Sequence, residues 1–81
     1  MNSKINELTK EAWSEDTKVF MATESLRKTL INLKIIATES NKKEEISVFA
    51  DFLADSIINI QVSTFKIKEI IKNIAKENKN E

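Results

Sequence analysis

The acids of the second half of the chain could do chemistry if their spacing brings them together. Asp51 and Asp55 are four residues apart, so both carboxylates lie on one face of a helix, where they could hold a hard cation or share a proton. Metal sites in helical bundles, however, combine Glu with a His three residues later, and this chain has no His. We therefore expect both carboxylates to lie on a solvated face.

Three hydroxyl residues interrupt the apolar pattern where Leu or Ile would be expected: Thr29, Ser56 and Ser63. If the chain folds back on itself near residue 42, residue i lies level with residue 84 − i, which places Ser56 beside Thr29 and Ser63 beside Ala22. The three hydroxyls could line a pocket for a small ligand or nucleotide. A simpler interpretation is a narrow layer in which each hydroxyl bonds the backbone one turn earlier.

The residue types that are missing exclude most catalytic classes. Without Cys there is no thiolate nucleophile and no Cys-ligated metal. Without His the chain lacks the commonest general base, and without Gly it lacks the loops that cradle phosphates. We therefore expect a protein that is not an enzyme and that needs no cofactor or metal.

The charge distribution does not favour nucleic acid as a partner. The chain has 13 basic and 13 acidic residues, so its formal net charge is zero. Lys66, Lys68, Lys72, Lys76 and Lys79 spread around much of a helix instead of forming the basic stripe typical of nucleic-acid readers. A nucleic-acid-binding bundle thus remains an alternative and not the main expectation.

Composition also bears on location and origin. No apolar stretch approaches the roughly 20 residues of a membrane span, and the first residues have no apolar signal-peptide core. We expect a cytoplasmic protein that makes no membrane contact. Abundant Ile, Lys and Asn indicate AT-rich coding DNA, as in low-GC bacteria and their phages and plasmids.

Apolar residues recur every seven positions in both halves, which predicts an all-α fold. The chain should form one domain over residues 1–81: a helix over about 3–39, a turn over about 40–43 and a helix over about 43–78. We expect the two helices to meet as a long antiparallel hairpin along the most regular rows. Those rows are Ile5, Ala12, Val19, Leu26 and Leu33, and Ile46, Leu53, Ile60, Ile67 and Ile74. Further apolar residues flank the rows on the same faces: Leu8, Ala22, Leu30, Ile36 and Ala37 in the first half, and Phe49, Ala50, Ile57, Ile70 and Ile71 in the second.

Two local features of this hairpin leave room for alternatives. Ser14, followed by two acids, could be the N-cap of a new helix, which would make the first residues a separate short helix. The unbroken seven-residue phase favours one continuous helix instead. In the turn, Asn41 is the residue best suited to a left-handed C-cap in a chain without Gly.

The charged residues support the antiparallel arrangement. Residues 25–43 contain five basic residues and one acid, whereas residues 44–65 contain four acids and no base. Residues 1–24 are acidic on balance, and residues 66–79 are basic. Folding at residue 41 places each block beside a block of opposite charge, which disfavours other alignments.

A second set of apolar residues lies away from these rows and suggests an interface. A lone two-helix hairpin buries little surface, so we expect a dimer that forms a four-helix bundle, or a higher oligomer. The same residues could instead bind a different protein. The predicted interface consists of Trp13, Phe20, Ile31, Ile35, Ile58, Val62 and Phe65.

Taken together, the sequence indicates a small helical interaction protein. It would oligomerise and bind another protein to inhibit, escort or regulate it, as immunity proteins, antitoxins, phage inhibitors and chaperones do. The alternatives are a nucleic-acid-binding bundle and a bundle that binds a small ligand or nucleotide.

Overall fold

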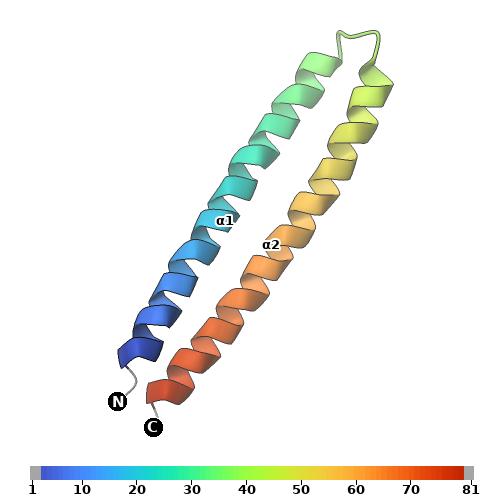
Figure 1. Cartoon of the computed structure of the whole chain (residues 1–81). Helices are drawn as coiled ribbons and strands as arrows, with labels where there is room; N and C mark the ends of the chain where they lie inside the picture. The colour runs from blue at the N-terminus through green and yellow to red at the C-terminus, as the bar shows by residue number, and fades with distance from the viewer. Residues whose placement is uncertain (1–2, 80–81) are drawn as a thin grey trace.

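The computed structural model describes residues 3–79, which form two long α-helices packed side by side in an antiparallel hairpin (Figure 1). Helix α1 spans Ser3–Ala37 and helix α2 spans Lys43–Lys79. The molecule is a rod of 63 × 14 × 11 Å. The all-α hairpin predicted from the apolar periodicity is confirmed, with α1 ending two residues earlier than expected and α2 one residue later.

Helix α1 is continuous through Ser14, so the alternative of a separate N-terminal helix is wrong. The physical reason lies in composition, because neither Gly nor Pro is present to interrupt a helix. An ion pair of 3.0 Å between Lys18 and Glu15, one turn apart, adds local support at this point.

The connection between the helices is made without a left-handed residue. No described residue has a positive φ angle, so the expected left-handed cap at Asn41 is wrong. The last turn of α1 tightens instead, and the amide of Ser40 donates to the carbonyl of Ala37 at 3.0 Å. The Ser40 hydroxyl then accepts a hydrogen bond of 3.0 Å from the amide of Lys42, the residue just before α2.

The contact line between the two helices, called the seam here, is formed by one row of buried residues on each helix. Both rows repeat every seven residues, and the most enclosed cluster, Leu30, Ala50 and Ile57, lies toward the turn. Farther from the turn the seam becomes polar. The buried rows are Asp16, Thr23, Leu30 and Ala37 on α1, and Ala50, Ile57, Thr64 and Ile71 on α2.

The rows that we expected at the centre of the seam lie beside it, so the expected centre is wrong. The seam is formed instead by residues that we expected to flank those rows, namely Leu30, Ala37, Ala50, Ile57 and Ile71, together with Asp16, Thr23 and Thr64. Val19 is 46% exposed and Ile60 is 42% exposed. Each helix carries an apolar stripe several rows wide, and one neighbouring helix can cover only part of it. The covered rows include Thr and Ala, small side chains that allow close approach. The regular aliphatic rows are partly buried near the turn, where Leu33 and Leu53 pack against the core, and are exposed farther from it.

The alignment of the helices follows the rule that paired residue numbers add up to about 84. Lys34 forms an ion pair with Asp51, and Asn78 donates a hydrogen bond to Asn6 at 2.6 Å. The sums, 85 and 84, agree with the expected fold point. The expected alignment is therefore confirmed over nearly the whole length of the rod.

Candidate functional site

The most distinctive surface of the molecule is an exposed apolar face that runs along one side of the seam. On both helices, the residue three positions after each buried residue lies on this side, as Val19 follows Asp16 and Ile60 follows Ile57. These inner rows are the regular aliphatic series of the sequence. They consist of Ile5, Ala12, Val19, Leu26 and Leu33 on α1, and Ile46, Leu53, Ile60, Ile67 and Ile74 on α2.

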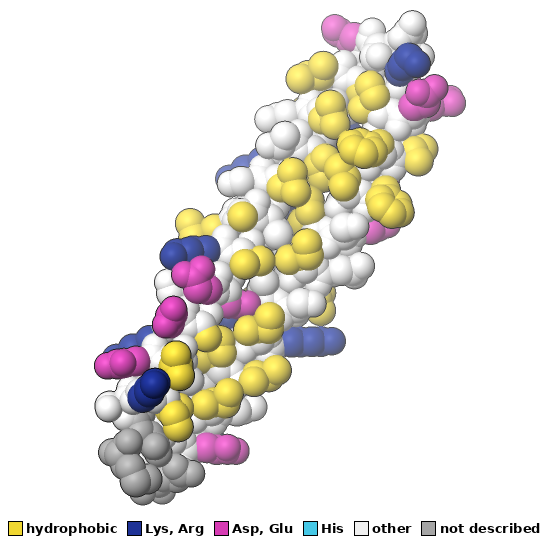
Figure 2. All heavy atoms as spheres, viewed as in Figure 1, with side chains coloured by type: hydrophobic (Ala, Val, Ile, Leu, Met, Phe, Trp, Pro, Cys, Tyr) yellow, Lys and Arg dark blue, Asp and Glu magenta, His cyan; other side chains and the backbone are white. Residues whose placement is uncertain are grey.

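Beyond each inner row lies an outer row, again with a spacing of seven. We call the two inner and two outer rows together the open face. Figure 2 shows hydrophobic side chains along both helices on the side toward the viewer, with charged side chains mainly at the edges and ends. The outer rows are Leu8, Glu15, Ala22, Thr29 and Ile36 on α1, and Phe49, Ser56, Ser63, Ile70 and Glu77 on α2, all of them exposed.

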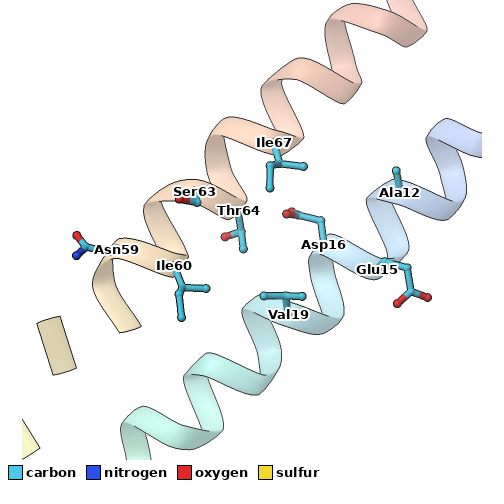
Figure 3. A pocket seen from close by; sticks show the side chains of 9 residues that line it. All are labelled: Ala12, Glu15, Asp16, Val19, Asn59, Ile60, Ser63, Thr64 and Ile67. Carbon is cyan, nitrogen blue, oxygen red and sulfur yellow. The ribbon is translucent and has the colours of Figure 1, made fainter. Parts of the chain in front are cut away.

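The open face is hollowed into a groove of about 570 Å³ in the half of the rod away from the turn. Apolar side chains of the inner rows form its walls, including Val19, Ile60 and Ile67. Figure 3 shows the carboxylate of Asp16 on the floor, pointing across the seam toward Thr64 and Ile67. The charged residues that line this groove, Glu15 and Asp16, are both acidic.

Asp16 is a buried carboxylate with one incompletely satisfied oxygen. Its side chain is 3% exposed, and its Oδ2 atom lies 3.3 Å from Nζ of Lys68 in an ion pair. That contact lacks hydrogen-bond geometry, and Oδ2 accepts no hydrogen bond from the described residues. A buried oxygen in this state carries a desolvation cost that the ion pair only partly offsets. Sequence reasoning missed Asp16, whose only signal is its place in the mixed row with Thr23, Leu30 and Ala37.

The opposite side of the seam, called the back face, is closed by polar contacts between the helices. Here lie the residues four positions after the buried ones, such as Gln61 and Lys68. The side-chain amide of Gln61 donates to Oε1 of Glu24 at 2.6 Å. Nζ of Lys68 donates to the hydroxyl of Thr17 at 2.6 Å and lies 4.1 Å from the ring centroid of Trp13. The two sides therefore differ: polar side chains join the helices across the back face, whereas the described part of the open face is mainly apolar and more exposed.

The structure divides the predicted interface residues between intramolecular packing and exposure. Phe20 and Phe65 make an edge-to-face contact across the hairpin, with centroids 5.6 Å apart. Trp13 lies under Lys68 and is 38% exposed. Despite its contact with Phe20, Phe65 is exposed, and so are the remaining members on or near the back face. The role of these exposed residues as an interface stays a prediction. We call them the back-face residues, namely Ile31, Ile35, Ile58, Val62 and Phe65.

The three predicted pocket hydroxyls do not converge on one site. Thr29 and Ser56 are exposed and donate to the carbonyls of Ser25 and Phe52 in their own helices, at 3.2 and 3.3 Å. Ser63 lines the groove of the open face. The arrangement agrees with hydroxyls that bond the backbone one turn earlier.

The paired acids and the lysines of α2 are not gathered around a common partner. Asp51 pairs with Lys34 across the hairpin, and Lys72 approaches Glu69 to 3.7 Å within α2. Within residues 3–79, no three carboxylates come together in a way that could hold a metal ion. Neither acids nor lysines therefore form a focused site.

Helix α2 is apolar enough to invite comparison with a membrane span. By length and composition alone it could cross a bilayer, since one 18-residue window has a mean hydropathy of 1.3, and 11% of that window is buried. Asp51 and Asp55, however, lie in its apolar first half, and each acid costs about 3 kcal/mol near the centre of a bilayer. Both acids would have to be accommodated if this helix lay in a bilayer.

No protein-family model matches this sequence, and neither the curated proteins nor the solved structures include a match to it.

Proposed function

We propose that this protein is a non-catalytic helical interaction protein that forms a dimer through its open face. Two hairpins packed in this way would make a four-helix bundle. The observation that carries the proposal is the open face itself, a largely apolar surface along both helices that the described residues 3–79 leave mostly uncovered. The dimer would then present its back faces to a different protein, which it would inhibit, escort or regulate.

The exposed area supports a stable partner of substantial size. The chain has an accessible surface of 6568 Å² and a mass of 9.3 kDa. A compact monomer of that mass exposes about 5,000 Å², so the excess is about 1,600 Å². A standard interface buries about 800 Å² on each partner, and permanent dimers bury more. The excess area is therefore in the range that a permanent dimer would cover.

A second copy is the occupant that the open face fits best. Both helices present aliphatic rows with the same spacing of seven, the pattern by which helices pack into bundles. With a formal net charge of zero, there is little long-range repulsion between copies. A second copy also brings a face of the same length and the same apolar character.

A different protein would bind the back-face residues, which a dimer through the open face leaves uncovered. Ile58, Val62 and Phe65 make a stripe on α2 in which each side chain is about half exposed. Trp13 lies on the same side, and Trp is enriched among residues that dominate binding energy. Binding of a different protein is also the class of function that the sequence indicates.

Sedimentation equilibrium over a wide concentration range tests dimer formation. We expect a dimer mass for the natural chain and a monomer mass for Leu26→Asp and Leu26→Lys, which place a charge on the inner row of α1. Ile35→Asp is the matched control, because Ile35 lies on the same helix but off the open face, and it should keep the dimer mass. Circular dichroism confirms that each variant is helical.

A helical natural chain that stays a monomer at every concentration would overturn the proposal. Flotation with phosphatidylcholine and phosphatidylglycerol vesicles measures whether the chain binds lipid instead. Binding to vesicles that is lost in Leu26→Asp would assign the open face to lipid and would also contradict the proposal.

A further inference from the structure

The open face permits two ways of placing a second copy, and the structure favours one of them. A face-to-face dimer has its two-fold axis in the plane between the hairpins. If the axis runs along the rod, both turns lie at the same end and α1 packs on α2 of the second copy. If the axis runs across the rod, the turns lie at opposite ends, and α1 packs on α1 and α2 on α2. We propose the second, antiparallel arrangement, and this inference rests on the dimer proposed above.

The outer row of α1 is nearly symmetric about its middle residue. Its residues are Leu8, Glu15, Ala22, Thr29 and Ile36, which read large, polar, small, polar and large in either direction. A two-fold axis across the rod at Ala22 places Leu8 against Ile36 of the second copy and Ala22 against its equivalent. Large residues then meet large ones, and the small ones allow close approach at the centre.

Helix α2 places its own small residue at the same level. Ser63 is level with Ala22, because the two numbers add up to 85 and the paired residues of the hairpin add up to 84 or 85. The same axis therefore passes between Ser63 and its equivalent. A small residue therefore lies at the axis in both contacts between the two copies: Ala22 where α1 packs on α1, and Ser63 where α2 packs on α2.

The acidic groove separates the two arrangements most clearly. In the antiparallel dimer, Glu15 lies opposite Thr29 of the second copy, whose hydroxyl can rotate to donate to a carboxylate. In the parallel dimer, Glu15 lies opposite Ile70 of the second copy, which would cover the carboxylate and its ion pair with Lys18 without adding a donor. Glu77 meets an apolar residue in both arrangements and does not distinguish them.

Single cysteines test the arrangement directly, because the natural chain has none. In the antiparallel dimer, Ala22→Cys and Ser63→Cys each lie close to the axis. Each variant alone should therefore form a disulfide-linked dimer under mild oxidation. Ile35→Cys, off the open face, is the control and should remain uncrosslinked.

The parallel dimer predicts the opposite pattern. Ala22 would face Ser63 of the second copy, so neither variant would link by itself and a mixture of the two would. That result would overturn the antiparallel arrangement while leaving the proposed dimer intact. Absence of every crosslink, together with a monomer mass in sedimentation, would instead overturn the proposed function. Helicity measured on the reduced variants excludes misfolding as the cause.

Discussion

At the scale of single residues, Lys68 is the most connected side chain of the back face. It contacts the buried carboxylate of Asp16, the hydroxyl of Thr17 and the ring of Trp13, and its own side chain is 21% exposed. Breaking a buried ion pair costs more than the pair contributes, because the remaining charge stays buried without a partner. Lys68 is therefore a sensitive position, although it looks like one of five ordinary lysines in the sequence.

We predict that Lys68→Met lowers the free energy of unfolding by about 2 kcal/mol, below the full cost for a buried pair because the ammonium is partly solvated. Lys72→Met is the matched control on the same helix and should change stability by less than about 0.5 kcal/mol, since its ion pair is exposed. Urea denaturation at one fixed protein concentration measures both. Equal stabilities of the two variants would contradict the role given to Lys68.

Trp13 supplies a second prediction at this scale. It lies on the back face under Lys68, so dissociation of a dimer formed through the open face should leave its surroundings unchanged. We expect the wavelength of maximum Trp fluorescence to stay constant on dilution from dimer to monomer. A shift to longer wavelength that follows dissociation would place Trp13 in the dimer interface, as the sequence alone suggested.

At the scale of the helices, the apolar spacing predicts their number, their approximate ends and their alignment. It fails to predict which row faces the other helix. The series through Ile60 and Val19 is more regular than the series through Thr64 and Asp16, yet the less regular series forms the seam. A wide apolar stripe contains positions for two neighbours, and spacing alone does not tell a neighbour in the same chain from one in another. For the same reason the open face could be listed from the sequence but not recognised as a surface.

The corrected seam makes a prediction about core packing. Ile57 is 2% exposed at the seam, and we expect Ile57→Ala to lower the free energy of unfolding by about 3 kcal/mol. Ile35→Ala, a change of the same size at an exposed position off the open face, should cost less than about 1 kcal/mol. Thermal or urea unfolding at matched concentrations compares them. Similar losses for both variants would argue against the seam described here.

At the scale of the whole molecule, the rod is extended for its length. Its radius of gyration is 18.4 Å, whereas a compact domain of this length has about 12 Å. Within residues 3–79, the buried hydrophobic residues are Leu30, Ala37, Ala50, Ile57 and Ile71, a small core for two helices of this length. Much of the stability should therefore come from association, and fold and assembly should be coupled.

This coupling predicts a melting temperature that depends on protein concentration. We expect the melting temperature of the natural chain to rise steadily with concentration, because dimer formation stabilises the folded state by mass action. Leu26→Asp should show a lower melting temperature that does not change with concentration. Calorimetry over a wide concentration range measures both melting temperatures. If the melting temperature of the natural chain does not change with concentration, the monomer is stable without association.

The position of the chain ends has a further consequence. The first and last described residues emerge side by side at the end of the rod away from the turn (Figure 1). In the antiparallel dimer, the two pairs of ends would then be held at opposite tips of a stiff bar, separated by a distance close to the rod length of 63 Å. Anything attached to the chain at either end would be displayed twice at a fixed separation. The hairpin would in that case act as a molecular spacer.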